Sequence, residues 1–266
     1  MSPAAEVMLV ASDGVRVHAT LTTGPGDVAF VVVHGFSGHA ASGEVLTIVR
    51  ALARHGSVVT VDLRGHGRSE GESTVGMLEV LDVDAAVQWA RELGFRRIVA
   101  LGFSMGAAVV VRHAALARDP EQGTSADPPV HAGVDAVVAV SGPAFWYYRG
   151  TPVMRTLHWL VETRSGRALL RLRGTRIRPQ EWPDPRPLEP VAAAGMLGPI
   201  PLLVVHGTAD RFFPLEHPRA MMAAALAGGH EDADVWILEG VGHAEAAMAA
   251  SMIDEMAEWG LARCSD

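Results

Sequence analysis

Short apolar runs alternate along the chain with longer stretches in which apolar residues recur at helical spacing. Continuous apolar runs bounded by turn-forming residues are typical of strands that helices cover on both faces. Such runs occupy residues 27–35, 57–63, 97–103, 134–142, 201–207 and 234–240. Helical patterns lie between them at residues 77–93, 105–118, 216–226 and 244–262. The alternation predicts an α/β fold, with a mostly parallel sheet flanked by helices.

The N-terminal part has a different pattern. Residues 15–21 alternate between apolar and polar positions, which predicts a strand buried on one face only. We expect this strand to form an antiparallel hairpin with residues 6–10, at one edge of the sheet.

The strand–helix alternation stops between residues 143 and 190. This segment holds the aromatic cluster Phe145–Tyr148, then an amphipathic helical pattern over residues 153–161, an arginine-rich apolar stretch over residues 168–177, and a proline-rich return. Ligands of α/β proteins bind at the carboxyl edge of the sheet. We therefore expect residues 143–190 to form a helical cap (lid) over a hydrolase core made of residues 1–142 and 191–266. The alternative is a structural excursion with no part in binding.

The stretch "GFSMG", residues 102–106, joins a predicted strand to a predicted helix. A serine in Gly-x-Ser-x-Gly between a buried strand and a helix is typical of a nucleophile elbow, where neighbours larger than glycine would collide. This context predicts that the Ser104 hydroxyl projects from the sheet edge as a nucleophile. A purely structural turn is the alternative.

A serine nucleophile needs a base to take its proton and a carboxylate to orient that base. Asp210 follows one predicted strand and His243 follows the last, so acid and base come after Ser104 in the order that this arrangement requires. The sequence therefore predicts a Ser104–His243–Asp210 triad. Asp232 and Asp234 are the rival acids.

The negative oxygen of an acyl-transfer intermediate needs backbone N–H donors. We expect these donors to be Phe36, in the "HGFSG" loop, and Met105, which follows the nucleophile. His34 is expected to brace the loop by hydrogen bonding. We further expect Phe145, Trp146, Tyr147 and Tyr148, together with Phe36 and Met105, to line an apolar substrate pocket.

Composition excludes several classes of function. The net charge is −8 and the pI about 5.8, so a nucleic-acid partner is not expected. A single cysteine excludes an internal disulfide. All 22 basic residues are arginine, which excludes Schiff-base chemistry and a P-loop lysine. Because no segment has 18 uninterrupted apolar residues, we expect no stable membrane insertion and a cytoplasmic location.

Five motifs in order, "HGFSG", "DLRGHGRSEG", "GFSMG", "HGTADRFFP" and "GVGHAE", resemble those of the α/β-hydrolase superfamily. The likeness is greatest to the cinnamoyl/feruloyl esterase and monoacylglycerol lipase group, and it covers the chain outside residues 143–190. It implies a serine esterase that acts on a small-molecule ester with no cofactor or metal. Haloalkane dehalogenases and epoxide hydrolases of this fold carry an aspartate at the elbow, and dienelactone hydrolases a cysteine, whereas this chain has Ser104.

A thioesterase, a perhydrolase and a C–C bond hydrolase use the same machinery, and a ligand receptor can be built on the same scaffold. The sequence does not separate these alternatives, nor does it predict the oligomeric state. Nine arginines lie between Arg149 and Arg186. We expect them to pair with carboxylates of the acidic core and so hold the cap in place. The alternative is that they steer an anionic substrate, an acyl carrier or an anionic membrane surface.

Overall fold

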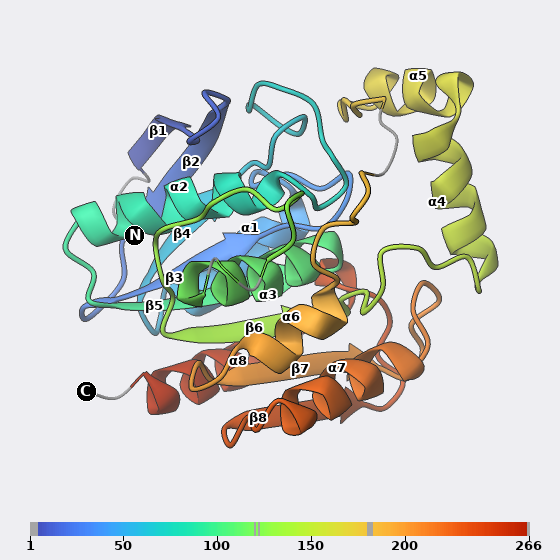
Figure 1. Cartoon of the computed structure of the whole chain (residues 1–266). Helices are drawn as coiled ribbons and strands as arrows, with labels where there is room; N and C mark the ends of the chain where they lie inside the picture. Colours follow the sequence, from blue (N-terminus) through green and yellow to red (C-terminus); the bar gives the residue numbers. More distant parts are fainter. Residues whose placement is uncertain (1–4, 120, 122, 180–182, 265–266) are drawn as a thin grey trace.

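An eight-stranded sheet forms the centre of the computed structural model, which describes residues 5–119, 121, 123–179 and 183–264 (Figure 1). The strands are β1 (Ala5–Val10), β2 (Arg16–Thr22), β3 (Val28–Val33), β4 (Ser57–Val61), β5 (Arg97–Phe103), β6 (Ala136–Val140), β7 (Leu202–Gly207) and β8 (Ala233–Leu238). Their order across the sheet is β1-β2-β4-β3-β5-β6-β7-β8.

Strands β4, β3, β5, β6, β7 and β8 run parallel, and only the edge pairs β1–β2 and β2–β4 are antiparallel. The expected N-terminal hairpin is thus present, with Ala5 opposite Leu21. The predicted α/β fold with a mostly parallel sheet is confirmed. The parallel order brings the carboxyl ends of the central strands to one edge, where the loops after them meet.

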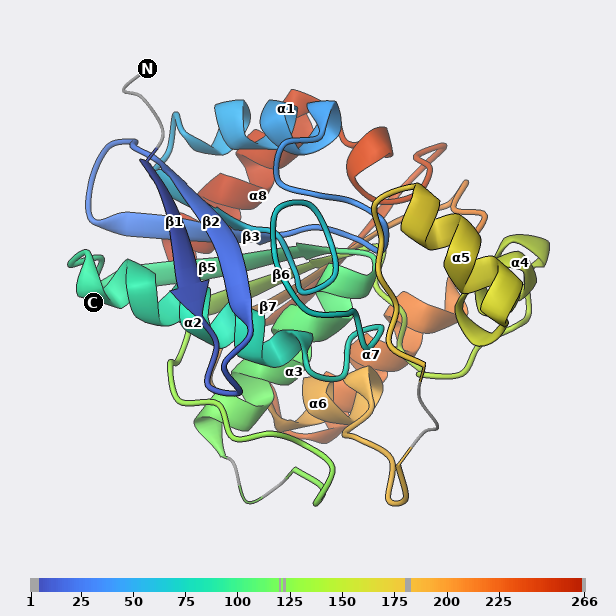
Figure 2. The ribbon, with the colours of Figure 1, turned by 90° about the horizontal axis from the view of Figure 1, so that it is seen from above.

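Helices cover both faces of the sheet (Figure 2). One face carries α1 (Gly43–Leu52) and α8 (Ala250–Arg263). The other carries α2 (Glu79–Glu92), α3 (Met105–Arg118), α6 (Pro190–Met196) and α7 (Glu216–Ala227). Two covered faces explain why β3 is apolar at every position: its alternate side chains enter two separate cores. Ala29, Val31 and Val33 enter one core, and Val28, Phe30 and Val32 the other.

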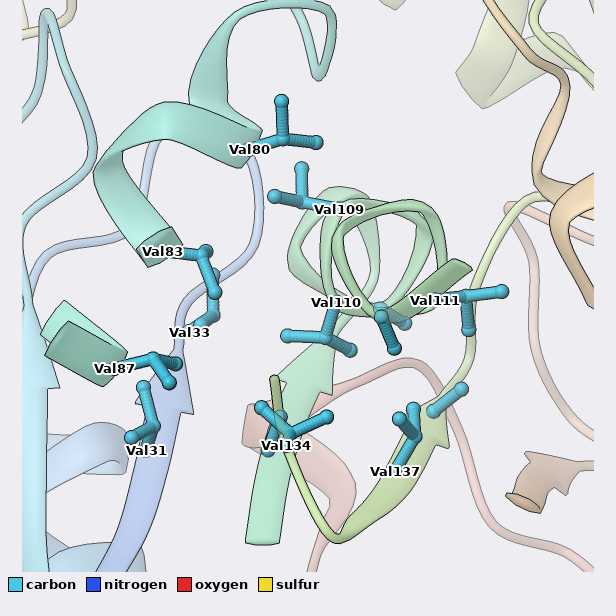
Figure 3. Packing of buried hydrophobic residues seen from close by; sticks show 14 of the residues in the cluster. Val31, Val33, Val80, Val83, Val87, Val109, Val110, Val111, Val134 and Val137 are labelled. Carbon is cyan, nitrogen blue, oxygen red and sulfur yellow. The ribbon is translucent and has the colours of Figure 1, made fainter. Parts of the chain in front are cut away.

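Valine dominates the core between the sheet and helices α2 and α3 (Figure 3). Val31 and Val33 from β3 meet Val83 and Val87 from α2 in this view. Their β-branched side chains favour strands and also fill the groove between a strand and a helix. All of these residues are fully buried, so this core holds α3, the helix that follows Ser104, rigidly against the strands.

Helices α1 and α6 are absent from the elements that the sequence predicts. Helix α1 has a clear N-cap, since the Ser42 hydroxyl accepts the Val45 N–H. The last helix was expected from residue 244, but α8 begins at Ala250 after a 3₁₀ turn, η2 (Glu245–Ala247). Ala244 has a φ of 52°, outside the helical region, and this conformation delays the helix.

The segment 143–190 carries α4 (Pro152–Glu162) and α5 (Arg164–Leu172), which stand apart from the layered core (Figures 1 and 2). Residues 180–182 of this segment lie outside the described residues. The arginines do not pair with the core as expected. Among the described residues, the arginines from Arg149 to Arg178 form a single ion pair, between Arg149 and Glu162, and both of these residues belong to the segment 143–190. Instead, Arg176 donates to the backbone carbonyls of Ser69 and Gly71 in the core. Carbonyl contacts therefore replace the expected ion pairs. Over the residues that the structure describes, no helix is long and apolar enough to cross a membrane.

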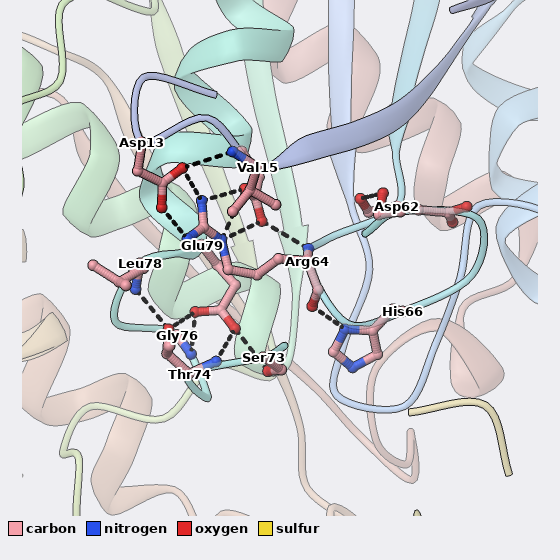
Figure 4. A network of polar contacts seen from close by, with 12 residues as sticks. Asp13, Val15, Asp62, Arg64, His66, Ser73, Thr74, Gly76, Leu78 and Glu79 are labelled. Atoms are coloured by element: carbon pink, nitrogen blue, oxygen red, sulfur yellow. Dashed lines mark hydrogen bonds and ion pairs between the residues drawn. The ribbon is translucent and has the colours of Figure 1, made fainter. Parts of the chain in front are cut away.

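A buried polar network supports the loop between β4 and α2 (Figure 4). The Arg64 guanidinium donates to Asp82 and to Asp13, with a distance of 2.7 Å between Nη2 and Asp82 Oδ1. Nearby, the Glu79 carboxylate accepts hydrogen bonds from Ser73, Thr74 and Gly76. Such a network costs desolvation energy, and it is tolerated because every charge in it has partners.

We expect Arg64→Leu to lower the free energy of unfolding by about 3–5 kcal/mol, because it leaves Asp82 buried without its cation. Urea denaturation followed by circular dichroism would measure the loss. The double variant Arg64→Leu/Asp82→Leu should recover most of it, since replacing a whole buried pair by apolar residues is often neutral. A single variant as stable as the wild type would contradict this account.

Candidate active site

Ser104 occupies the sharp turn between β5 and α3, with φ 51° and ψ −117°. Two glycines allow this turn. A Cβ on Gly102 would lie 2.3 Å from the Gly106 carbonyl oxygen, and a Cβ on Gly106 would lie 2.4 Å from the Val33 carbonyl oxygen. Both contacts are too short for any side chain, so the helix can approach the strands this closely only with glycine at both positions. The structure thus has the nucleophile-elbow geometry that the sequence predicts.

Three side chains from separate loops form a continuous chain of hydrogen bonds. His243 Nε2 lies 2.9 Å from Ser104 Oγ, and His243 Nδ1 lies 2.7 Å from Asp210 Oδ2. An ionised carboxylate only accepts, so Nδ1 carries the proton and donates it to Asp210. In the neutral ring Nε2 is then the acceptor for the Ser104 hydroxyl. The structure brings together the three residues predicted as the triad.

Asp210 lies almost fully buried at the end of β7. Burial alone would raise its pKa, but the hydrogen bond and charge of His243 and the N–H groups of Phe213 and Phe212 hold the pKa below its ordinary value. Oδ1 accepts the Phe212 N–H at 2.7 Å and the Phe213 N–H at 3.1 Å. The rival acids lie elsewhere: Asp232 and Asp234 both pair with Arg263. Asp210 is therefore a fixed anion facing His243.

Two further contacts hold the histidine loop in place. The His243 ring stacks on Phe212, with ring centroids 3.9 Å apart and planes inclined by 17°. The next residue, Ala244, donates its N–H to Ser141 Oγ at the end of β6. The ring stacking and the backbone hydrogen bond together fix the orientation of the imidazole. A catalytic base must be held in a fixed orientation.

Phe36 and Met105, whose N–H groups are expected to form the oxyanion hole, line the same cavity as Ser104. In the described part of the chain, neither Phe36 N–H nor Met105 N–H donates a hydrogen bond to a protein acceptor. Met105 begins α3, where an amide has no partner within the helix, and the helix dipole adds positive potential. Both donors are thus free to bind a negatively charged oxygen.

His34 and His66 brace the loop that carries Phe36. His34 Nε2 accepts the Leu63 N–H at 3.1 Å, so Nδ1 carries the proton and donates it to the Gly35 carbonyl at 2.7 Å. His66 Nε2 accepts the Ser37 N–H in the same way. Burial lowers the pKa of His34 to about 3 and also lowers that of His66, so both rings are neutral at pH 7. The bracing role expected for His34 fits these contacts.

A cavity of about 250 Å³ opens above Ser104. All the residues expected to line a substrate pocket are on its wall: Phe36, Met105, Phe145, Trp146, Tyr147 and Tyr148. The segment 143–190 adds Met154, Leu157 and Val161 from α4. A larger cavity of about 500 Å³ lies beside β2 and includes no triad residue, so the smaller one is the candidate site.

Trp146 has a defined place in this wall. Its indole Nε1 donates to the Pro187 carbonyl at 2.9 Å, and the buried Arg112 guanidinium lies 4.8 Å from its ring centroid. Arg112, which lies on α3, also donates to the carbonyls of Leu188 and Gly76. These bonds connect α3 to the end of the segment 143–190 and to the loop before α2. Trp146 is therefore held in place by the core as well as by the segment 143–190.

Sequence reasoning missed four residues that shape the site. Ser141, Phe212, His206 and Glu245 contact the triad or its loops. His206 Nε2 donates to the Phe213 carbonyl, and burial lowers the pKa of its ring. A signal existed for three of them, since His206 and Phe212 lie in the "HGTADRFFP" motif and Glu245 ends the "GVGHAE" motif, whereas Ser141 lies in neither. Within the described residues, no group of histidine, cysteine, aspartate or glutamate side chains has the arrangement of a metal site.

Comparison with known proteins gives a family match and several similar structures. The alpha/beta hydrolase family matches residues 30–259. Esterase LipC of Mycobacterium tuberculosis is 28% identical over 171 residues, which are 62% of this chain and 40% of LipC. This chain therefore matches only about two fifths of the length of that relative.

Among solved structures, the esterase Pf2001 of Pyrococcus furiosus aligns with a TM-score of 0.73 at 18% identity, covering 99% of this chain and 93% of Pf2001. Est1E of Butyrivibrio proteoclasticus, solved with bound ferulic acid, has a TM-score of 0.62 at 20% identity and covers 98% of this chain and 100% of its own. Both likenesses show the shared fold.

We expect Asp210→Asn to slow the labelling of Ser104 by a fluorophosphonate by on the order of 10³-fold or more. The amide would favour the wrong tautomer of His243, and Ser104 would lose its base. Mass spectrometry over a time course would measure the labelling rate. Asp234→Asn, which changes an acid outside the hydrogen-bond chain, should label at the wild-type rate. The reverse result would assign the acid to Asp234.

Proposed function

Because this chain belongs to the alpha/beta hydrolase family, we propose that it is a serine hydrolase that cleaves carboxylic esters through Ser104, His243 and Asp210. The observation that carries the proposal is the hydrogen-bond chain from Asp210 through His243 to Ser104, at the floor of an apolar cavity. LipC and Pf2001 are both named as esterases, which supports the choice of ester substrates.

In the first half of the reaction, the Ser104 oxygen attacks the acyl carbon while His243 Nε2 takes the hydroxyl proton. The carbonyl oxygen becomes negative and is bound by the N–H groups of Phe36 and Met105. Asp210 stabilises the imidazolium that has formed. His243 then gives its proton to the leaving alkoxide, and an acyl-enzyme remains on Ser104.

In the second half, a water molecule takes the place of the alcohol. His243 takes a proton from the water as it attacks the acyl carbon, and then returns that proton to Ser104. The acid leaves and the free enzyme is restored. His243 alternates between base and acid, so it must stay neutral at rest. Its packing on Phe212 keeps the ring in line for both steps.

Most of the cavity wall is aromatic or aliphatic, which favours an apolar acyl or aryl group, and Glu162, Arg167 and Arg178 add charged groups to the same wall. A volume of about 250 Å³ lies just below the range of about 300–1,000 Å³ that is usual for small-molecule pockets. We infer that residues 143–190 act as a cap that closes this space over the core formed by residues 1–142 and 191–266. The wall supplied by α4 and by Tyr147 and Tyr148 supports that division.

We expect Ser104→Ala to abolish the hydrolysis of p-nitrophenyl acetate, with a loss of about 10⁴-fold or more in kcat. The melting temperature should change little, since among the described residues the Ser104 hydroxyl forms a side-chain hydrogen bond with His243 only. Absorbance at the product wavelength would measure turnover. Substantial activity in the alanine variant would refute Ser104 as the nucleophile.

We expect kcat/KM to be highest for short acyl chains and to fall for p-nitrophenyl laurate, which exceeds the cavity. Trp146→Ala removes a large side chain from the wall and so enlarges the cavity. It should shift the preference toward longer chains and raise the laurate/acetate ratio of kcat/KM several-fold. Trp159→Ala serves as the matched control, because Trp159 is exposed on α4 and does not line the cavity. Equal losses on every ester would show that Trp146 acts only in folding.

A further inference from the structure

A second carboxylate lies beside the nucleophile and has no place in the triad mechanism. Glu245, on the 3₁₀ turn two residues after His243, reaches back to the loop after β3. Its Oε1 accepts the Gly35 N–H at 2.6 Å, across 210 residues of sequence. Burial raises the pKa of this carboxyl, as does the nearby charge of Glu44, whereas the Gly35 N–H and the proximity of His243 lower it.

The position of this carboxylate is not explained by an ion pair. Among the described residues, no arginine or histidine forms a salt bridge with Glu245, although Asp13, Asp82 and Asp127 each pair with an arginine. Its partner is a peptide N–H instead. Hydrogen bonds from peptide N–H groups to carboxylates are charge-assisted and stronger than neutral ones.

Gly35 leaves just enough room for this contact. A Cβ at Gly35 would lie 3.1 Å from Ser104 Cβ and 3.4 Å from both carboxylate oxygens of Glu245. Nucleophile, glycine and carboxylate therefore pack against one another. The absence of a side chain also gives the Gly35 backbone more conformational freedom than other residues have, so contacts from outside are needed to fix its conformation.

The Gly35 peptide units control the direction of the Phe36 N–H. The carbonyl of Gly35 and the N–H of Phe36 belong to one planar trans peptide, so they point in opposite directions. His34 Nδ1 and Gly38 N–H both donate to that carbonyl, at 2.7 and 3.1 Å, and hold one side of Gly35. Glu245 holds the other side of Gly35 by accepting a hydrogen bond from the N–H of Gly35 itself. Together these bonds restrain both backbone torsions of the glycine.

We propose that Glu245 is a positioning residue of the oxyanion hole, whose carboxylate fixes the Gly35 amide and so aims the Phe36 N–H at the substrate oxygen. The inference rests on the serine esterase function proposed above. Removing one oxyanion donor outright costs about 10²–10³-fold in kcat. Misdirecting a donor that is still present costs less, and the effect belongs to kcat because the oxygen becomes negative only in the transition state.

The test compares Glu245→Ala, which removes the acceptor, with Glu245→Gln, which keeps an oxygen acceptor without the charge. On p-nitrophenyl acetate the alanine variant should lose about 10-fold to 100-fold in kcat with KM changed less than about threefold. The glutamine variant should recover to within a few-fold of the wild type. The control Glu239→Ala removes an exposed carboxylate four residues before His243 and should keep wild-type kcat.

Wild-type kcat in Glu245→Ala, or an equal loss in the alanine and glutamine variants, would overturn the proposal. The Ser104→Ala baseline separates this failure from that of the esterase proposal. If the wild type turns over no faster than Ser104→Ala, ester hydrolysis is wrong, and the positioning role is decided by hydrogen exchange of the Gly35 amide. That amide should be protected in the wild type and in Glu245→Gln and exchange faster in Glu245→Ala; equal exchange in all three would overturn the role.

Discussion

The contact between the two glycines at the end of β5 is the constraint on which the active site depends. Gly102 and Gly106 let the first turn of α3 lie against the strands at a distance that no side chain would permit. The same approach puts Ser104 in a strained backbone conformation and leaves the Met105 amide without a helical partner. The proposed nucleophile and one proposed oxyanion donor thus both result from one close approach, which the buried valine core around α3 maintains.

Much of the fold could be predicted because parallel strands covered on both faces are apolar throughout. The residues of the proposed triad could be found because each follows an apolar run that predicts a strand, although β8, the strand before His243, is an edge strand with Val235 and Ile237 exposed. The boundaries that could not be predicted have a physical cause in the site itself. The last helix begins at Ala250 rather than at residue 244 because the chain around Ala244 adopts a positive φ that positions His243. Function at this loop overrides the helical preference of an alanine-rich sequence.

The contribution of Glu245 could not be predicted for a different reason. Its partner is the backbone of Gly35, which has no side chain and is 210 residues away, so no spacing or pairing of residue types marks the contact. The arginines of residues 143–190 show the same limit. Charge balance predicted ion pairs with the acidic core, yet Arg176 binds carbonyls of Ser69 and Gly71 instead. A guanidinium satisfies backbone acceptors as readily as carboxylates, and composition carries no information on which it meets.

The loop that carries Phe36 combines two kinds of support. Two neutral histidines, His34 and His66, hold the loop on the side of β4. Burial keeps both rings uncharged, and their hydrogen bonds determine which nitrogen carries the proton. A carboxylate holds the loop on the side of His243. A positive charge on the histidine side would remove an acceptor for the Leu63 or Ser37 amide, whereas a negative charge on the Glu245 side strengthens the bond to Gly35. The neutral histidines and the Glu245 acceptor therefore favour the same loop conformation, in which the proposed donor is in place before a substrate arrives.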